Sequence, residues 1–175
     1  ACATPQELRV ISVDQESGVD SAELEAMLDS YKPDFVCGYI HRMHEKMGEN
    51  RTWAQFLPNP SRIDYLSAMM YCHAHVGAVE RAMKIAVTPR AEYIRVITSE
   101  LNRLASHLVW FGAFVLDLGG FTPLLYAFDD REKILDLFEW TCGARLLYNY
   151  NWVGGVSHDL PDGFLRATRD MLREF

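Results

Sequence analysis

The position of one acidic residue suggests chemistry before any element is considered. Asp117 interrupts the longest strongly apolar run of the sequence, Leu108 to Leu118. Burial in such a run would raise the pKa of the carboxyl group or require a basic partner, and a plain core helix has little reason to carry it. A carboxylate at a helix C-terminus is also electrostatically unfavourable. Asp117 is therefore a candidate functional residue, and an ordinary exposed aspartate beside Gly119 is the alternative.

Histidines and cysteines do not combine into a metal site in this sequence. His41 lies near His44, and His73 and His75 lie beside Cys72, but neither group has enough further ligands at the spacing of a metal site. The four cysteines, at positions 2, 37, 72 and 142, are far apart and form no CxxC. This pattern argues against a disulfide framework and against zinc. We expect reduced, mostly buried thiols and no metal bound by this chain.

Three further polar residues share one face of a long apolar segment. Glu100, Arg103 and His107 fall within about a third of a helix circumference, on the side away from the apolar residues. Such a group predicts a polar network between packed helices.

Absent motifs and charge exclude several classes of function. The sequence contains no GxGxxG, GxxxxGK[ST], HExxH, GxSxG or ExxH, so we expect no NADH binding by this chain itself. A net charge of −7 without a basic stretch argues against nucleic acid as a partner. The longest apolar run falls short of the roughly 20 residues that a membrane crossing needs. We therefore expect no transmembrane segment, and Ala1 to Glu7 shows no signal-peptide pattern.

Composition predicts one compact globular domain that can bury a core. The 175 residues are 49% hydrophobic and 23% charged, with seven prolines and no low-complexity run. Leu8 to Val13 is rich in β-branched residues and predicts a short strand, and Asp20 to Ser30 predicts a small helix. We assign residues 1–37 to this N-terminal segment and residues 38–175 to a helical domain.

Helical spacing of apolar residues dominates the rest of the chain. A helix is plausible from Gly38 to Asn50, and Pro58 and Pro60 then break it. Ser61 and Asp64 have the form of a capping box and predict a helix over Arg62–Met83. Its apolar face would be formed by Leu66, Met69, Met70, Val76, Val79 and Met83.

The clearest helix signal follows at Thr88 and Pro89, which suit the N-cap and the first helical position. This helix is predicted to run to Leu118, and its apolar stripe consists of Ile94, Ile97, Leu101, Leu104, Leu108, Phe111 and Val115. A helix over Asp129–Arg145 would direct Ile134, Leu137, Phe138 and Leu146 inward, and Gly154-Gly155 would end the segment after it. A last helix would be lined by Phe164, Met171 and Leu172. The predicted fold is mainly α, a long antiparallel helix bundle with a small N-terminal β element.

Several stretches along the chain form a series with near-constant spacing. They are Gly38-Tyr-Ile-His-Arg42 leading to Glu45-Lys46, Glu49-Asn-Arg-Thr52, Arg90 to Pro123 with its Ile-Arg-Val-Ile core, Asp130-Arg-Glu-Lys-Ile-Leu-Asp-Leu-Phe-Glu139, and Gly154-Gly-Val156 followed by Asp159-Leu-Pro161. In this order they resemble the D subunit of respiratory complex I and its membrane-bound hydrogenase relatives, over about Gly38 to Phe175. The resemblance implies the hydrogenase-large-subunit-like fold, truncated here to under half the length of a full member.

One segment separates the two branches of this resemblance. In the hydrogenases, the stretch that matches Arg62-Ile-Asp-Tyr-Leu-Ser67 carries the cysteines that bind the nickel-iron centre. Here those places hold Asp64 and Ser67. A thiolate-dependent centre cannot be built from one carboxylate and one hydroxyl, so hydrogen chemistry is excluded.

In the complex I branch, the residue that matches Tyr65 faces a quinone. The resemblance implies that Tyr65 donates a hydrogen bond, and a proton, to a quinone carbonyl during reduction. A phenol suits this role because it is amphipathic and neutral at rest. The alternative is a tyrosine on an amphipathic helix with its ring in the core.

The resemblance assigns roles to further residues and also meets two departures. It pairs Asp117 with a quinone-facing histidine from an N-terminal hairpin, but the nearest counterpart here, Thr4-Pro-Gln-Glu-Leu-Arg9, has none. Arg42 and Arg62 match arginines near the last iron-sulfur cluster, where positive charge raises the potential of the cluster. The alternative for each is a surface ion pair. A histidine that many members place near that cluster corresponds here to Leu147.

The function implied is a quinone-site subunit of a proton-translocating NADH:quinone oxidoreductase. It would receive electrons from an iron-sulfur cluster held by a partner subunit, with quinone as substrate and no cofactor bound by this chain alone. Implied partners are the iron-sulfur subunit, other peripheral-arm subunits and the membrane-arm subunits, at the cytoplasmic face of the membrane. The isolated chain would be inactive.

A scaffold or binding domain that keeps the fold without quinone chemistry is the alternative. The missing histidine, Leu147 and the short length favour it. Burial of Tyr65 in the core and pairing of Asp117 with a basic residue would distinguish it from the quinone-site hypothesis.

Overall fold

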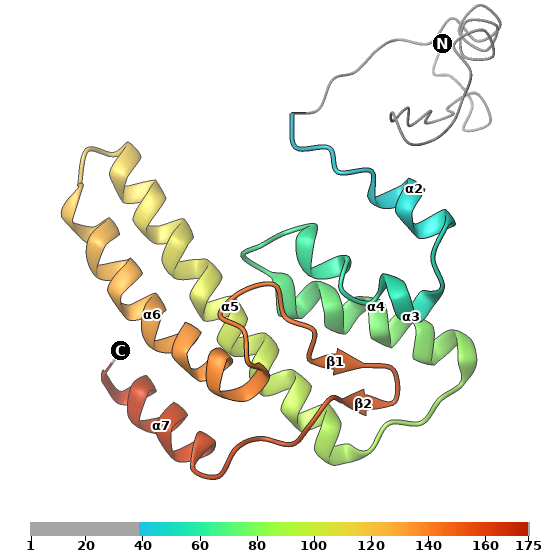
Figure 1. The fold of residues 1–175 in the computed structure, drawn as a ribbon. Helices are drawn as coiled ribbons and strands as arrows, with labels where there is room; N and C mark the ends of the chain where they lie inside the picture. The colour runs from blue at the N-terminus through green and yellow to red at the C-terminus, as the bar shows by residue number, and fades with distance from the viewer. Residues whose placement is uncertain (1–38, 175) are drawn as a thin grey trace, which may run out of the picture. The chain divides into compact units, whose positions relative to one another are not determined.

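The structure is a computed structural model that describes residues 39–174 (Figure 1). The chain divides into two compact units, residues 1–51 and residues 52–175, and each is described by itself. The predicted strand at Leu8–Val13 and the predicted helix at Asp20–Ser30 lie outside the described residues.

The described part of the first unit contains one short helix, α2 (His44–Glu49). It is shorter than the helix predicted over Gly38–Asn50. Met43 precedes it in the left-handed conformation, and the side chains of Lys46 and Glu49 form an exposed ion pair with a nitrogen–oxygen distance of 3.1 Å. The backbone N–H of Asn50 then bonds carbonyls of the last turn and ends the helix.

The second unit is mainly helical, as predicted. Its elements are α3 (Trp53–Phe56), the 3₁₀ helix η1 (Pro60–Arg62), α4 (Ala68–Met83), α5 (Pro89–Asp117), α6 (Thr122–Cys142), β1 (Asn151–Trp152), β2 (Gly155–Val156) and α7 (Phe164–Glu174). A capping box between Thr52 and Gln55 starts α3. Among the described residues, the strands are confined to an antiparallel hairpin that pairs Asn151 with Val156 and Trp152 with Gly155. The Gly154-Gly155 pair therefore lies in this hairpin, with Gly154 in its turn at a φ of 96°.

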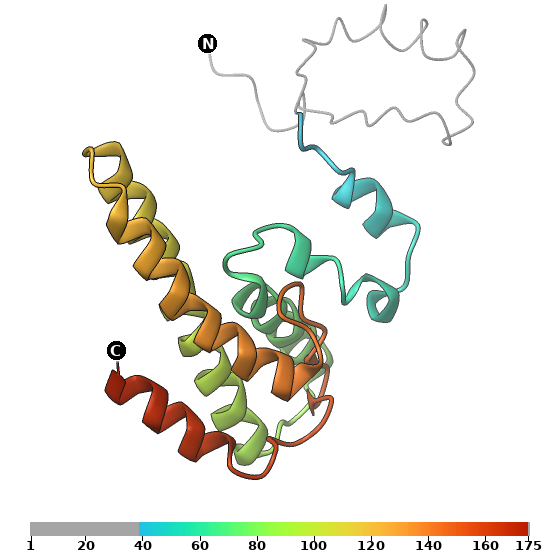
Figure 2. The same cartoon turned by 60° about the vertical axis from the view of Figure 1, so that its left-hand side comes forward.

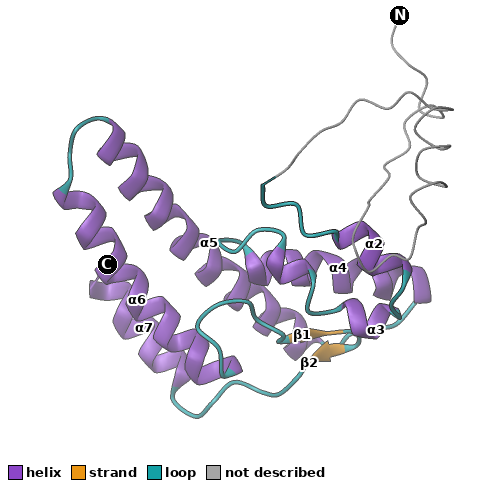
Figure 3. Ribbon diagram, turned by 45° about the horizontal axis from the view of Figure 1, so that its top comes forward, coloured by secondary structure: helices purple, strands orange, loops and turns teal. Residues whose placement is uncertain are grey.

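Helices α5 and α6 form a long antiparallel hairpin, and α7 lies beside α6 (Figure 2). The hairpin turns at Gly119, which adopts a φ of 97° that favours glycine. The two helices approach closely at Gly112, where an added Cβ would lie 2.9 Å from Leu124 Cδ1. Helix α4 packs against α5, and the strands contact these two helices (Figure 3).

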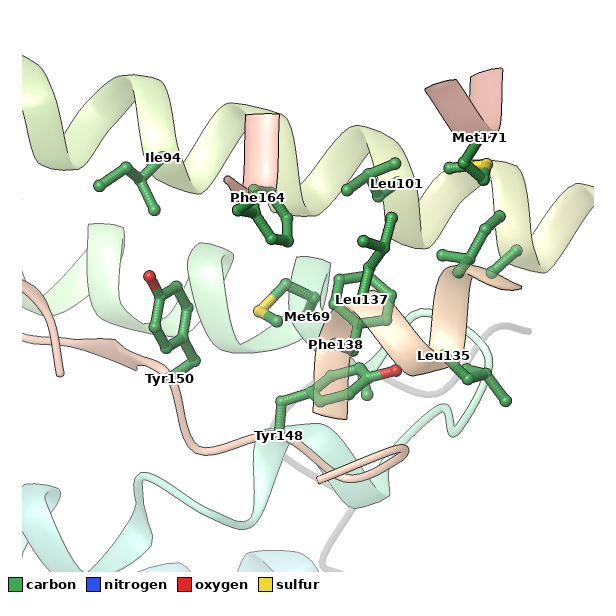
Figure 4. Close-up of a cluster of buried hydrophobic side chains, with 13 residues drawn as sticks. Met69, Ile94, Leu101, Leu135, Leu137, Phe138, Tyr148, Tyr150, Phe164 and Met171 are labelled. Carbon is green, nitrogen blue, oxygen red and sulfur yellow. The ribbon is translucent and has the colours of Figure 1, made fainter. Parts of the chain in front are cut away.

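The core lies where α4, α5, α6, α7 and the segment before β1 meet (Figure 4). Its fully or nearly fully buried side chains include Met69, Ile94, Leu101, Ile134, Phe138, Tyr148, Tyr150 and Phe164. The rings of Phe138 and Tyr148 pack with centroids 4.7 Å apart. Most of the predicted inward residues are thus buried or half-buried, but six are exposed: Leu66, Met70, Met83, Phe111, Leu146 and Leu172.

The predicted start of the helix over Arg62–Met83 is wrong, because α4 begins at Ala68. Ser61 caps no helix: its hydroxyl donates to the carbonyl of Pro58 at 2.7 Å. The Asp64 carboxylate accepts from the backbone N–H of Leu66 at 3.0 Å and closes a local turn. Short polar side chains bond nearby backbone and compete with helix formation in this way.

The prediction for α5 agrees closely with the structure, whereas the predicted start of α6 is wrong. Helix α5 has Thr88 at the N-cap, although the Thr88 side chain makes no capping hydrogen bond, and it ends at Asp117. Helix α6 starts at Thr122, seven residues before the predicted Asp129, and ends at Cys142 with Gly143 as its left-handed cap. Leu125 and Tyr126, in the first turns of α6, are exposed. The helical spacing of inward apolar residues, from which this helix was predicted, therefore begins only after them.

Candidate functional site

The loop between η1 and α4 presents Tyr65 to solvent. The ring is 49% exposed and lies on a turn, which contradicts the alternative of a helical tyrosine in the core. The loop is anchored from α5 by the buried side chain of Asn102. Its amide oxygen accepts from the backbone N–H of Met69 at 3.2 Å, and its amide nitrogen donates to the carbonyl of Leu66 at 3.1 Å. Asn102 thus caps α4 and fixes the backbone that follows Tyr65.

Arg62 is exposed at the end of η1. One terminal nitrogen of its guanidinium donates to the carbonyl of Pro58 and to the hydroxyl of Ser61, both at 2.8 Å. This geometry holds the side chain against the turn that precedes the Tyr65 loop. Arg42 is also exposed, and it belongs to the first unit, whereas the Tyr65 loop belongs to the second.

Asp117 is exposed at the last position of α5, which agrees with the alternative of an ordinary exposed aspartate beside Gly119. It lies 15 residues beyond Asn102 on the same helix, which corresponds to about 22 Å along the axis at 1.5 Å per residue. Since Asn102 is bonded to the Tyr65 loop, the structure does not bring Tyr65 and Asp117 together. Leu147 is half-buried in the segment before β1, with a φ of 57°.

The polar group predicted between helices lies on an exposed face instead. Arg103 and Glu100 form an ion pair whose side chains are each about half-exposed, and His107 is exposed. The predicted network between packed helices is therefore wrong.

A buried ion pair that was not predicted from the sequence joins α4, α5 and the hairpin. Arg95 donates to the two carboxylate oxygens of Glu80 at 2.9 and 2.6 Å, and both side chains are buried. Arg95 also donates to the carbonyls of Trp152 and Gly155, each at 2.8 Å, while the N–H of Gly154 donates to Glu80 at 2.7 Å. The hydrogen bonds from Arg95 hold the pKa of the Glu80 carboxyl group below its usual range.

A sequence signal for this pair did exist. Arg95 follows Ala91 and precedes Asn102 on a second helical stripe of small and polar residues, and Glu80 lies four residues after the buried Val76. Charged residues at buried positions require partners, so this stripe pointed to a buried network.

Pockets line the α4–α5 crossing. His73 Nδ1 lies 3.2 Å from the hydroxyl of Ser99, and both residues line a hollow with Met70, Gly77 and Arg81. Burial lowers the pKa of His73. Another pocket lies between the start of α5 and the β hairpin, and is lined by Arg90, Ile94 and Asp159. Tyr65 and Asp117 line neither of them.

The cysteines of the second unit are free thiols, of which Cys72 is buried and Cys142 is partly buried. Cys72 donates to the carbonyl of Tyr148 at 3.5 Å, and Cys142 donates to that of Phe138 at 2.9 Å. Burial raises the pKa of each thiol to about 11. Cys2 and Cys37 lie outside the described residues.

Two negative findings concern residues 39–174. Over this range, no three or more histidine, cysteine, aspartate or glutamate side chains are grouped as a metal site requires. No helix in the same range is long and apolar enough to span a bilayer.

Comparison with known proteins identifies the family. The profile of the respiratory-chain NADH dehydrogenase 49 kDa subunit matches residues 117–175. The D 2 subunit of NADH-quinone oxidoreductase from Opitutus terrae is 72% identical over 138 residues, which are 79% of this chain and 35% of that protein. The D subunit from Desulfotalea psychrophila is 66% identical over 142 residues, or 81% of this chain and 38% of that protein. The D subunit from Clostridium beijerinckii is 49% identical over 139 residues, with 79% and 38% covered.

The chain thus spans little more than a third of the length of these relatives. Their similarity covers most of the present sequence, including the two long helices that position the Tyr65 loop. The chain belongs to the family of the D subunit of NADH-quinone oxidoreductase, the 49 kDa subunit of the respiratory-chain NADH dehydrogenase, and covers a portion of that subunit.

Proposed function

We propose that this chain forms one wall of a quinone-reduction site, as part of a D subunit assembled into an NADH:quinone oxidoreductase. The observation that carries the proposal is the Tyr65 loop. Its phenol is half-exposed while its backbone is fixed by Asn102. A catalytic donor needs this combination, because the group must reach its substrate from a defined position.

The surroundings of Tyr65 suit an apolar, planar substrate. Ile63, Leu66, Met70 and Tyr71, all within six residues of Tyr65, are exposed apolar or aromatic side chains. Exposed apolar surface of this kind typically marks a binding region. We propose that it contacts the quinone ring while the Tyr65 hydroxyl donates a hydrogen bond to one carbonyl oxygen. That bond stabilises the negative charge which develops as two electrons arrive, before protons complete the quinol.

Arg62 and Arg42 have a supporting role in this proposal. Both guanidinium groups are exposed, so each is accessible to an iron-sulfur cluster held by a partner subunit. Positive charge near such a cluster raises its potential and favours electron arrival. This chain would bind no cluster itself, and electrons from NADH would reach it through the partner subunits.

The assembly proposed for this chain is a peripheral one. The iron-sulfur subunit, the other peripheral-arm subunits and the membrane-arm subunits would be its partners, at the cytoplasmic face of the membrane. Quinone reduction would drive proton translocation elsewhere in the complex. The isolated chain would be inactive, because its electron donor is absent.

Asp117 has a less direct place in the proposal. Its exposure at the end of α5 leaves the carboxylate available to a basic group from another segment. The distance from Tyr65 argues that it acts on proton supply or assembly and does not contact the same quinone carbonyl. A scaffold domain without quinone chemistry is the second candidate, and this separation of Tyr65 from Asp117 is the observation that favours it.

The test is Tyr65→Phe in an assembled complex whose D subunit carries this sequence. Phenylalanine keeps the ring and removes the hydroxyl, so NADH:quinone reductase activity should fall by at least about tenfold, because one transition-state hydrogen bond is lost. Electron transfer from NADH to an artificial acceptor upstream of the quinone should be unchanged. Tyr93→Phe is the matched control, because it removes the hydroxyl of a different exposed tyrosine, which lies on α5. Unchanged quinone reductase activity in Tyr65→Phe would favour the scaffold domain.

A further inference from the structure

Arg131 is a buried cation on α6 that the described residues leave without a carboxylate. Arg131 has a relative exposure of 9%, and its Nε has no hydrogen-bond partner. The contact that the structure assigns to it is with Phe128, whose ring centroid lies 5.9 Å from the guanidinium carbon. An arginine remains charged at any relevant pH, so burial without a counter-charge is strongly unfavourable.

The acidic residues of α6 do not solve this problem, because four of them pair with other cations and the fifth, Asp129, is exposed and forms no ion pair with Arg131. Asp130 pairs with Lys133 at 3.0 Å, and Asp136 pairs with Arg145 at 2.7 Å. Glu132 and Glu139 are also ion-pair partners of Arg145. Within residues 39–174, no ion pair or hydrogen bond joins Arg131 to any carboxylate.

The surface beside Arg131 is apolar and open. Leu125 and Phe128 are exposed on the same helix, and Phe128 is the residue whose ring faces the guanidinium. A guanidinium over an exposed aromatic ring can bind a carboxylate from a segment that packs on that ring, since arginine binds carboxylates through two parallel hydrogen bonds.

We propose that Arg131 binds an aspartate or glutamate side chain from the part of the D subunit polypeptide that this chain does not include. The matched relatives supply the missing length, because the chain covers 35–38% of them. The incoming segment would cover Phe128 and Leu125 while its carboxylate neutralises the guanidinium. This inference rests on the family of the chain and is independent of quinone chemistry.

The first experiment measures thermal unfolding of the purified 175-residue chain. Arg131→Met replaces an uncompensated buried charge by an apolar side chain of similar length, so the midpoint should rise by about 2–8 °C. Arg166→Met is the control, because the Arg166 side chain is 90% exposed and its removal should leave the midpoint nearly unchanged. A lower midpoint for Arg131→Met would mean that the charge is already compensated within this chain, and would overturn the proposal.

The second experiment identifies the carboxylate. A full-length protein is made in which this sequence replaces the matching residues of the Opitutus terrae relative, with Arg131→Lys. A carbodiimide then joins paired amines and carboxylates, and mass spectrometry locates the link. The Lys133–Asp130 pair is the internal positive control. A link from the introduced lysine to an acidic residue outside this chain's sequence is expected. A link to an acidic residue within residues 1–175, or none while the control link forms, would overturn the proposal.

In the full-length protein with Arg131 retained as the reference, the change in thermal midpoint caused by Arg131→Met should have the opposite sign. Arg131→Met would now leave the incoming carboxylate buried and unpaired, so the midpoint should fall where it rises in the shorter chain. A rise in both proteins would contradict the proposal.

Discussion

At the scale of single residues, the best-defined feature is the ion pair between Glu80 and Arg95. A buried charge pair is weak evidence for net stability, but the loss of one partner is costly because the other charge stays buried. Here Arg95 also bonds carbonyls of the β hairpin, so the pair connects three segments that are distant in sequence.

Glu80→Gln should lower the free energy of unfolding by about 3 kcal/mol, because Arg95 would remain as a buried cation. Urea unfolding of the purified chain, followed by circular dichroism, measures the change. Glu100→Gln is the control, since it removes an ion pair whose side chains are about half-exposed and should cost at most about 1 kcal/mol. Equal midpoints for the two variants would contradict the structural role of Glu80.

The buried thiols give a second prediction at this scale. With a pKa of about 11, each of Cys72 and Cys142 is ionised in about one molecule per thousand at pH 8. In a Cys2→Ser, Cys37→Ser background, disulfide-exchange reagents should therefore modify the native chain slowly and the unfolded chain at once. Cys142, which is partly exposed, should react before the buried Cys72. Rapid modification of both thiols at pH 8 in the native chain would contradict the burial that raises their pKa.

At the scale of elements, the α5–α6 hairpin depends on a close approach at Gly112. An alanine Cβ there would lie 2.9 Å from Leu124 Cδ1 and 3.2 Å from Leu124 Cα, and the backbone atom cannot move aside without moving α6. Gly112→Ala should destabilise the chain by about 1–3 kcal/mol.

Gly77→Ala is the matched control for this helix contact. Gly77 lies within α4, and a Cβ there would meet nothing within 4 Å. Since alanine is the better helix former, this change should stabilise the chain by about 0.5–1 kcal/mol. Thermal unfolding of both variants measures the difference, and destabilisation of equal size in the two would argue against close packing at Gly112.

The loop that carries Tyr65 precedes α4 and depends on α5 through Asn102. Asn102→Ala removes two hydrogen bonds and leaves the N–H of Met69 and the carbonyl of Leu66 without these partners. Chymotrypsin should then cut after Tyr65 several-fold faster, because the loop opens more easily. Asn149→Ala, a change at an exposed asparagine, should leave the cleavage rate unchanged. An unaltered rate in Asn102→Ala would mean that other contacts hold the loop.

At the scale of the whole molecule, acid sensitivity follows from pKa values that folding lowers. The hydrogen bonds from Arg95 lower the pKa of Glu80, and burial lowers those of His73 and His75. In each case the unfolded chain binds the proton more readily than the folded chain. The folded state therefore loses stability as pH falls, first below about 6.5 through the histidines and then below about 4.5 through Glu80.

The check is the free energy of unfolding measured between pH 3 and pH 8. Glu80→Gln should be less stable at neutral pH but should lose less stability than the wild type below about pH 4.5, because its side chain cannot titrate there. His75→Gln should flatten the curve between about pH 5 and 6.5. A wild-type stability that increases on acidification would contradict all of these assignments.

Local signals in the sequence were sufficient for helix α5 and for much of the core. Thr88 and Pro89 located the start of α5 because capping and the fixed φ of proline act within a few residues. Ile94, Leu101, Ile134 and Phe138 were found because helical period is itself a local property. The matching stretches from Gly38 onward also indicated the family, since similarity along the chain needs no knowledge of contacts.

Only the tertiary structure decided the features that depend on distant partners. The start of α4 is capped by Asn102, which lies 33 residues after the backbone N–H that it binds, so Ser61 and Asp64 were free to close local turns instead. Glu80 joins Arg95 and Gly154 across two further segments. The lack of a carboxylate partner for Arg131 within residues 39–174 was likewise not visible in the sequence. Periodicity places a residue on a face of a helix, whereas burial depends on which other segments cover that face.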